Sequence, residues 1–448
     1  MRNTGNMQIQ VFEGESFLPI PEAKVTLLQT REDSSRQIEQ ITSTDSSGLT
    51  NQIQLNTPSI DFSMKPSDNL PYSFCDIKVD APGYETLLVK DCQIYPDTLA
   101  LQQCRMEKAK GGRQEIVINI PPNTLVGNFP PKIPEDPNKP EPKPSGEVVL
   151  KEPVIPEFIV VHQGLPDDSG TKNYTVRYKD YIKNVASSEI FATWPETTIR
   201  ANVYCIISFT LNRIYTEWYR GKGKNFDITN STAYDHAFTF GRNIYSNISR
   251  IVDDIFSTYA KRPGRKQPLL TQYCDGVKVQ CPGWLTQWGS KYLGDKGEVP
   301  YDILINFYGA NLEFERAKQV RGIPMSYPGY VLKLGSSGEP VRTIQKYLNR
   351  IAQNYPAIPK QIVDGIYGNK TKESVTVFQK TFFLPQIGVV DYPTWYKISD
   401  IYVGVTKIAE LQQRDIVNLQ ALRKYEKGIF TPPTPYGNVN IPTIEYPL

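Results

Sequence analysis

The sequence predicts a multidomain protein with an N-terminal β-sandwich, a central α+β domain and a small C-terminal domain of three helices. Apolar and polar residues alternate over 7–107 with turn signals between the runs, which is typical of antiparallel strands. Two helical patterns meet at a break within 178–215, which predicts a helical core for the centre of the chain. Apolar helix faces and glycine-marked turns over 330–403 predict the third domain.

Residues 1–110 are the expected β-sandwich. The runs MQIQVF, AKVTLLQT and DTLALQQCRM alternate, and TDSSGLT and APGY are turn signals. PIPEAKVTL, TDSSG and APGYE follow one another as they do in transthyretin-like modules related to the carboxypeptidase regulatory domain, and the segment resembles those modules. The resemblance implies a domain that is not itself catalytic.

Residues 111–149 are the expected linker. Prolines interleave with Lys, Glu and Asp, most densely in PPKIPEDPNKPEPKPSGE, so the sequence predicts an extended, solvated segment. EIVINI at 115–120 is compatible with one further strand. Two interpretations fit equally well: a spacer, and a protease-sensitive junction between a pro-region and a mature enzyme.

The centre of the chain is organised around a predicted pair of helices. The first ends at Glu189, and Tyr178, Ile182 and Val185 lie on the same face as this carboxylate. Thr193 is placed to cap the second helix. The buried stripe predicted for the second helix consists of Ile199, Val203, Ile206, Thr210, Leu211 and Ile214.

Glu189 is the candidate catalytic residue. A carboxylate on an apolar helix face is expected to have a raised pKa, which suits a general acid. The alternative is a helix-end glutamate that is solvated or paired with a nearby Lys or Arg, which is the commoner situation.

Four segments of the expected domain 150–323 together resemble the SpoIID family of peptidoglycan lytic transglycosylases. They are the helix pair, FDITNSTAYDHAF (226–238), QYCDGVKVQCPGWLTQWGSKYLGDKG (272–297) and GEVPYDILINFYGANLEF (297–314). The resemblance implies that Glu189 is the acid/base. It also places the substrate-binding residues in the third segment, as Tyr273, Lys278, Trp284 and Trp288. For Trp194, a core position is expected.

Lytic transglycosylases need one carboxylic acid, whereas ordinary glycosidases use two. Two alternatives therefore stay open. One is a hydrolytic muramidase with Asp227 or Asp235 as the second carboxylate. The other is a non-catalytic cortex-binding or structural spore protein. No cofactor and no metal are expected for the reaction.

Six cysteines in 448 residues do not indicate a disulfide scaffold. Cys205 lies in the second helix pattern and is expected as a small core residue. Cys274 and Cys281 are expected as free thiols, with a disulfide and a zinc site shared with His236 as alternatives.

The expected domain 324–403 contains LKLGSSGEPVRTIQKYLNRI, VDGIYGNKTKESVTVFQKTF and GVVDYPTWYKI, which resemble the type 1 peptidoglycan-binding domain. The resemblance implies that the glycan is bound through Asp364, Tyr367, Phe378 and Trp395. The pattern departs from the family at Gln386, Ile387 and Gly388, where an Asp-Gly pair is usual. Residues 404–448 are expected to form a helix followed by an extended tail.

Charge and hydropathy exclude two classes of partner. A net charge of +3 from 50 basic and 47 acidic residues gives no support for nucleic-acid binding. No run of 18 apolar residues exists, so no membrane span is expected. The start, MRNTGNMQIQVF, lacks the pattern of an ordinary secretory signal, so we expect a route other than that signal, or retention in the producing cell.

The order of the parts resembles that of spore cortex-lytic enzymes. This resemblance implies a zymogen held in the cortex or coat–cortex region of the dormant spore. A subtilisin-like germination protease would remove the pro-region, with a cut expected near 147–150. The mature enzyme would cleave the β-1,4 bond between MurNAc and GlcNAc in cortex peptidoglycan. Residues 1–110 are expected to dock near Glu189 until then.

Overall fold

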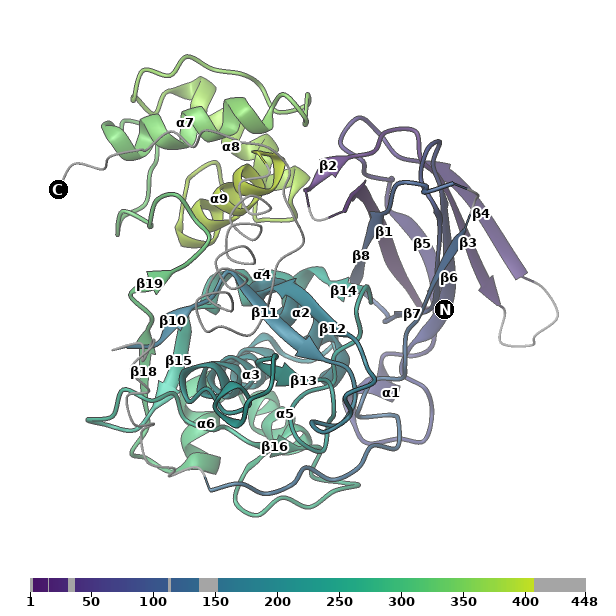
Figure 1. The fold of residues 1–448 in the computed structure, drawn as a ribbon, viewed down its shortest axis with the longest axis vertical. Helices are drawn as coiled ribbons and strands as arrows, with labels where there is room; N and C mark the ends of the chain where they lie inside the picture. Colours follow the sequence, from purple (N-terminus) through teal and green to yellow (C-terminus); the bar gives the residue numbers. More distant parts are fainter. Residues whose placement is uncertain (1–2, 15, 31–36, 112–113, 137–151, 407–448) are drawn as a thin grey trace, which may run out of the picture. The chain divides into compact units, whose positions relative to one another are not determined.

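The computed structural model describes residues 3–14, 16–30, 37–111, 114–136 and 152–406, which belong to one unit of the chain (Figure 1). Its N-terminal part is a pair of five-stranded sheets. The first sheet contains β1 (Asn3–Glu13), β2 (Leu18–Pro19), β5 (Ile53–Thr57), β8 (Leu99–Met106) and β14 (Ile244–Tyr245). The second contains β3 (Lys24–Thr30), β4 (Gln37–Ser43), β6 (Ser73–Asp80), β7 (Thr86–Ile94) and β9 (Glu115–Asn119). A short helix, α1 (Asp61–Met64), lies between β5 and β6.

The period-two pattern of the N-terminal strands places their apolar residues between the sheets. In β6, Cys75, Ile77 and Val79 are buried while the residues between them are partly exposed. The sequence boundary at 110 is wrong in one respect, because β9 pairs in parallel with β7 and belongs to this domain. The first sheet also takes an edge strand from the central domain, since β14 pairs with β8.

The central domain is mixed α and β, and α3 (Glu196–Tyr215) is its central helix. It contacts the other helices of the domain, which are α2 (Tyr178–Glu189), α4 (Ser246–Ile255), α5 (Gln287–Asp295) and α6 (Pro300–Tyr308). A 3-10 turn, η1, spans Arg220–Lys222. Short strands complete the domain: β10 (Val154–Ile155), β11 (Phe158–His162), β12 (Asn173–Arg177), β13 (Ile228–Thr229), β15 (Thr258–Lys261), β16 (Tyr273–Cys274), β17 (Leu285–Thr286), β18 (Glu313–Arg316) and β19 (Gln319–Val320).

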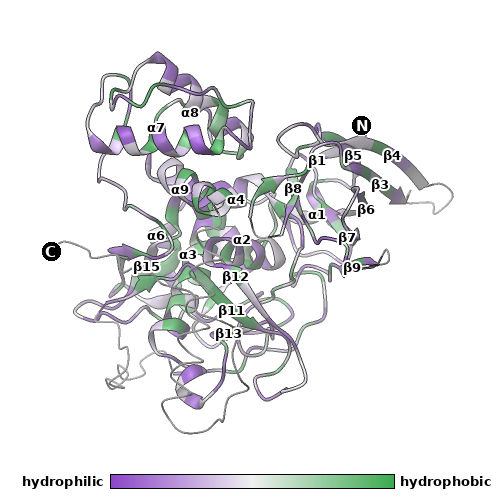
Figure 2. Cartoon of the chain, turned by 45° about the horizontal axis from the view of Figure 1, so that its top comes forward, coloured by the Kyte–Doolittle hydropathy of each residue, from purple (hydrophilic) through white to green (hydrophobic). Residues whose placement is uncertain are grey.

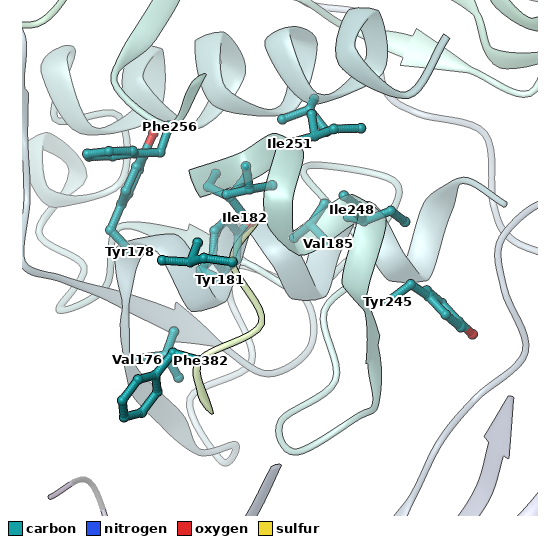
Figure 3. Packing of buried hydrophobic residues seen from close by; sticks show 14 of the residues in the cluster. Val176, Tyr178, Tyr181, Ile182, Val185, Tyr245, Ile248, Ile251, Phe256 and Phe382 are labelled. Carbon is teal, nitrogen blue, oxygen red and sulfur yellow. The ribbon is translucent and has the colours of Figure 1, made fainter. Parts of the chain in front are cut away.

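The predicted helix pair is present, and its apolar faces are buried. Ile182 and Val185 of α2 lie beside Ile248 and Ile251 of α4 (Figure 3). The predicted stripe of α3 is buried except for Ile214, which is half-buried. These contacts fix the direction of α2 and therefore the position of Glu189 at its end.

Thr193 does not cap α3. The N-cap is Pro195, and the Thr193 hydroxyl instead donates to Ser63 of the N-terminal domain at 2.8 Å. Trp194 is a core residue, as expected, and its ring nitrogen donates to the Ser63 carbonyl at 2.9 Å. The loop between α2 and α3 is thus held by the N-terminal domain.

The C-terminal domain contains α7 (Glu339–Ile351), α8 (Asn369–Thr381) and α9 (Tyr392–Thr406). In Figure 2, α7 alternates between hydrophilic and hydrophobic colours along its length, as an amphipathic helix does. α9 contacts α4 of the central domain, and the Tyr392 hydroxyl lies 2.6 Å from that of Ser257. The prediction for 407–448 lies outside the described residues. Within the described ranges, none of the helices could cross a bilayer.

Candidate functional site

Glu189 lies at the C-terminal end of α2 with 3% of its surface exposed. One carboxylate oxygen accepts a hydrogen bond from the Ala237 N–H at 2.6 Å, and the other accepts one from the Tyr273 hydroxyl. Its main-chain carbonyl accepts a bond from the Gln287 amide at 2.9 Å. Segments distant in the sequence therefore fix this carboxyl group.

The pKa of Glu189 is raised, chiefly because burial disfavours its charged form. The nearby Lys132 ammonium opposes this shift most strongly, followed by the hydrogen bonds from Tyr273 and Ala237. The negative end of the α2 dipole acts in the same direction as burial. A carboxyl group that holds its proton to higher pH suits a general acid.

The cavity at Glu189 is small because another segment fills it. It has a volume of about 70 Å³, which is room for a few water molecules. Its walls include Glu189, Tyr273 and Lys278 of the central domain and Phe129, Pro130 and Lys132 of the proline-rich segment. A second cavity of about 350 Å³ shares Phe129 and Pro130 with the first. Residues 129–130 therefore line both cavities, of which the first contains the candidate acid in its wall.

We call residues 121–136 the strap. Its backbone is bound to the central domain at several points: Thr124 N–H donates to the Ser188 carbonyl at 3.0 Å, and Ile133 N–H donates to the Ala233 carbonyl at 2.7 Å. Lys278 donates from its ammonium group to the Val126 carbonyl at 2.7 Å. The expectation of a solvated linker is therefore wrong for this part of 111–149, because residues between the prolines have specific partners.

Lys132 of the strap places a cation beside Glu189. Its ammonium group donates to the Asp235 carbonyl at 2.6 Å and lies 4.7 and 4.4 Å from the ring centres of Phe209 and Tyr273. Burial lowers the pKa of Lys132 to about 8, although the charges of Glu189 and Asp235 act in the opposite direction. The sequence carries no periodic signal for this contact.

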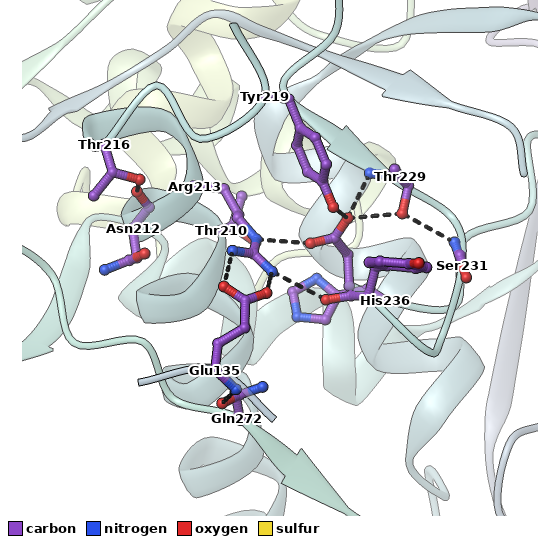
Figure 4. A network of polar contacts seen from close by, with 12 residues as sticks. Glu135, Thr210, Asn212, Arg213, Thr216, Tyr219, Thr229, Ser231, His236 and Gln272 are labelled. Atoms are coloured by element: carbon purple, nitrogen blue, oxygen red, sulfur yellow. Dashed lines mark hydrogen bonds and ion pairs between the residues drawn. The ribbon is translucent and has the colours of Figure 1, made fainter. Parts of the chain in front are cut away.

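A second strap residue, Glu135, forms an ion pair with the buried Arg213 (Figure 4). The two terminal guanidinium nitrogens lie 2.6 and 3.0 Å from the two carboxylate oxygens of Glu135. Asp235 accepts from the remaining nitrogen, Nε, at 2.7 Å. The other oxygen of Asp235 accepts from Tyr219 and Thr229. Asp235 is thus a fixed structural anion.

The remaining carboxylates near the site also have structural partners. Asp227 pairs with Arg220 at 2.5 Å and accepts from the Val160 N–H at 2.8 Å. Asp275, in the cavity wall, accepts from the N–H groups of Lys278 and Val279. Neither carboxylate suggested for a hydrolytic muramidase is therefore placed to activate water, because Asp235 and Asp227 are held by buried or paired cations and backbone donors.

Cys274 and Cys281 form a disulfide with their Cα atoms 6.1 Å apart. This contradicts the expectation of free thiols and leaves no thiolate for zinc. The reason is tertiary: β16 and β17 pair in parallel, so the loop between them returns to its start. His236 is buried, with Nδ1 3.0 Å from the Tyr181 hydroxyl. In the part of the chain that the structure describes, no cluster of three His, Cys, Asp or Glu residues could hold a metal.

The tryptophans expected at the substrate lie elsewhere. Trp288 packs against Phe191 and Trp194, with ring centres 5.9 and 5.1 Å away. Neither Trp288 nor Trp284 belongs to the cavity wall at Glu189. Of the four expected substrate-binding residues, the structure brings Tyr273 and Lys278 to Glu189, and Lys278 is bound to the strap there.

Residues 337–398 match the model of a family described as a putative peptidoglycan binding domain. The third domain is a peptidoglycan-binding domain. Peptidoglycan is therefore a partner of this chain, which has a cell-wall-related role. A search of curated proteins gives no match.

Solved structures give weak similarities. The SleB N-terminal domain aligns with 27% identity over 17% of this chain and 99% of its own length, with a TM-score of 0.15. A catechol 1,2-dioxygenase mutant of Acinetobacter radioresistens aligns with 14% identity over 26% of this chain and 58% of its own, with a TM-score of 0.18. 3-Chlorocatechol 1,2-dioxygenase of Rhodococcus opacus aligns with 11% identity over 27% of this chain and 60% of its own, with a TM-score of 0.16. TM-scores this low establish no common fold.

The peptidoglycan-binding domain buries most of the residues expected to contact glycan. Tyr367 and Phe378 are fully buried, and Trp395 is 1% exposed with its ring nitrogen donating to the Met325 carbonyl. Asp364 accepts from the Ile366 N–H and from Gln345, so it stabilises a turn. These residues hold the domain together. The three aromatic residues are therefore core residues, whereas Asp364 lies at the surface.

Proposed function

We propose that this protein is the latent form of a spore cortex-lytic enzyme resembling SleC, with a central SpoIID-like lytic transglycosylase domain. Its transthyretin-like N-terminal domain and the strap would form the pro-region. After proteolysis during germination, the enzyme would cleave the MurNAc–GlcNAc β-1,4 bond of cortex peptidoglycan. The observation that carries this proposal is Glu189, a buried acid with a raised pKa, in a cavity whose other carboxylates, Asp235 and Asp275, are held by a buried arginine and by backbone donors.

The proposed reaction uses Glu189 as both acid and base. Protonated Glu189 gives its proton to the glycosidic oxygen as the bond to the anomeric carbon breaks, and an oxocarbenium-like centre develops. The resulting carboxylate then takes the proton of the C6 hydroxyl, whose oxygen closes the 1,6-anhydro ring. The proton returns to Glu189, and water is not consumed. The hydrogen bonds from Tyr273 and Ala237 hold the carboxyl group in one orientation throughout.

Latency would follow from the strap. Residues 129–132 occupy the space beside Glu189, and the Lys132 cation favours the ionised carboxyl, which cannot act as an acid. The N-terminal domain touches the loop after Glu189 through Ser63, but the residues over the carboxyl come from the strap and not from 1–110. The proposed cut near 147–150 lies outside the described residues.

A turbidity assay on decoated spores tests the proposed activity against the non-catalytic alternative. The cleaved protein with its strap weakened by Lys132→Ala and Glu135→Ala should lower the optical density of the spores and release soluble muropeptides. A pure binding protein would sediment with the spores and release nothing. That result would remove the enzymatic part of the proposal.

We expect the activity of the cleaved chain to fall as the pH rises through the pKa of Glu189, because a general acid must carry its proton. In the intact chain Lys132 lies beside Glu189 and lowers that pKa, so Lys132→Met should raise the pKa of the Glu189 carboxyl, measured by NMR titration of the intact protein. Lys296→Met, at the end of α5, is the control and should leave that pKa in place. A lower pKa of Glu189 in Lys132→Met would contradict the charge interaction.

The peptidoglycan-binding domain exposes two adjacent apolar side chains, Leu334 and Ile366, at 56% and 57%. Their loops are joined by a bond from the Gly335 N–H to the Tyr367 carbonyl at 3.0 Å. Exposed apolar side chains grouped in this way often mark binding surfaces. Replacing both with Asp should weaken cosedimentation with insoluble cortex by about tenfold, while turnover of short soluble glycans stays within about threefold.

Ile41→Asp, in the N-terminal domain, is the matched control because Ile41 is 60% exposed. Point variants are preferable to deletion of the domain, since α9 packs on Phe256 and Ser257 of the central domain. Unchanged cosedimentation of the double variant would place the binding surface elsewhere on the domain.

A further inference from the structure

We propose that Arg213 and Gln272 form a binding site for a carboxylate of the muramoyl residue or its stem peptide, which Glu135 of the strap occupies in the latent chain. This inference rests on the proposed function, because it assigns a substrate group to the same groove. Glu189 would act on the glycosidic bond. The proposed site would instead bind an anion and an adjoining peptide unit.

Arg213 is held ready for an anion by parts of the central domain alone. Its side chain is fully buried, and its Nε donates to Asp235. The guanidinium carbon lies 4.7 Å from the ring centre of Phe209 and 5.7 Å from that of Tyr219. These contacts fix the plane of the group before any strap residue is added. The fork of terminal nitrogens then faces Glu135.

Gln272 recognises the backbone of the strap next to that carboxylate. Its side-chain oxygen accepts from the Glu135 N–H at 3.0 Å, and its side-chain nitrogen donates to the Ile133 carbonyl at 3.0 Å. A side-chain amide that bonds one N–H and one carbonyl of an extended segment would bind any peptide in this way. Residues 133–135 therefore lie in the domain as a bound peptide with an acidic side chain.

Departure of the strap would leave this site unsatisfied. The Nη1 atom of Arg213 would lose Glu135, and Nη2 would keep the Tyr234 carbonyl at 3.1 Å. A buried guanidinium with open donors strongly favours a replacement anion. Asp235 remains, so the site changes from two carboxylates around one guanidinium to one.

The distance from Glu189 suits a muramoyl carboxylate. Glu135 follows Lys132 by three residues, which is about 10 Å of extended chain, and Lys132 lies beside Glu189. Muramic acid carries its lactyl group and stem peptide on the ring whose glycosidic bond is cut. A chain bound with that bond at Glu189 would therefore present peptide or lactyl carboxylates to Arg213.

Binding can be measured without catalysis. The test protein is the full chain with Glu189→Gln to prevent turnover, plus Lys132→Ala and Glu135→Ala to remove both strap contacts. Calorimetry would compare N-acetylmuramoyl dipeptide, the same compound with its carboxylates amidated, and N-acetylmuramic acid. We expect the dipeptide acid to bind at least tenfold more tightly than its amide. Preference for N-acetylmuramic acid would assign the lactyl carboxylate, and preference for the dipeptide would assign the stem.

Two further variants separate recognition from folding. Gln272→Ala should lower the affinity for the dipeptide severalfold and leave the melting temperature of the protein nearly unchanged. Arg213→Lys keeps the charge but loses the fork, and should abolish the preference for acid over amide. In the control protein, Glu152→Ala takes the place of Glu135→Ala. Glu152 pairs with Lys318 outside the strap. This protein should not bind the dipeptide, because the Glu135 carboxylate still occupies Arg213. Equal affinity for acid and amide, or no binding of either, would overturn the inference.

The outcome is independent of the proposed reaction. If the cleaved wild-type chain degrades cortex but the binding variant does not prefer the acid, the carboxylate site is wrong and the enzymatic proposal stands. If the acid is preferred but the cleaved chain with Lys132→Ala and Glu135→Ala releases no muropeptide, the site stands and the enzymatic proposal is wrong.

Discussion

Replacing Glu189 with glutamine is expected to lower the rate of glycan cleavage by about 10³-fold or more. The amide keeps the shape of the side chain, and its oxygen can accept from the Ala237 N–H while its NH2 group donates to the Tyr273 hydroxyl oxygen, so the fold should be retained. It has no proton to give to the glycosidic oxygen. The measurement is kcat/KM of the cleaved protein on soluble cortex fragments, together with its melting temperature.

The matched control is Glu157→Gln. Glu157 is a partly buried carboxyl of the same domain whose pKa is also raised by burial, but it lies in a different cavity, with Arg177 and Lys179. Its replacement should leave kcat/KM within a few-fold of the value for the protein without the substitution. Activity of Glu189→Gln close to that of the control would remove Glu189 from the mechanism.

Weakening the strap is expected to have the second-largest effect on activity. A specific protease site inserted within 137–149 allows the full chain to be cut without removing any described residue. We expect the cut alone to raise activity only slightly, because the strap keeps its bonds to the central domain. The cut chain carrying Lys132→Ala and Glu135→Ala should be at least about 100-fold more active than the cut wild type. Charged hydrogen bonds contribute about 1.5–3 kcal/mol each, and 1.4 kcal/mol corresponds to a factor of ten.

The experiment compares intact, cut and cut-variant proteins on the same decoated spores, with Glu152→Ala as a control substitution outside the strap. A buried polar contact gives a further reason for slow release: Asn243 donates to the Gln93 carbonyl at 3.0 Å, joining the central and N-terminal domains. Equal rates for all three proteins would show that the strap does not inhibit.

The helix pair and its acid could be predicted because helical periodicity is a local signal. Glu189 shares a face with Ile182 and Val185, and a face so apolar is buried wherever the helix packs. Helical periodicity shows only that Arg213 is a charged residue in a largely apolar helix, and it does not predict what Arg213 binds. Its partners, Glu135 and Asp235, are 78 and 22 residues away in sequence.

The strap could not be predicted, because proline-rich composition specifies an extended backbone and says nothing about what that backbone touches. The prediction of free thiols at the two cysteines was wrong for a similar reason. The spacing of Cys274 and Cys281 fits several states, and only the pairing of β16 with β17 decides between them. In the peptidoglycan-binding domain, the aromatic residues that carry the resemblance fill the core, so the motif indicates the fold and does not identify the ligand contacts.

Mass spectrometry of the released muropeptides tests the central claim most directly. The cleaved, strap-weakened chain would be incubated with decoated spores and the soluble products analysed without chemical reduction. A transglycosylase with Glu189 as its only acid/base gives MurNAc ends in the 1,6-anhydro form, each lighter by one water than the hydrolysed product. Products that are all hydrated, with reducing MurNAc or GlcNAc ends, would contradict the mechanism and show that water is the nucleophile.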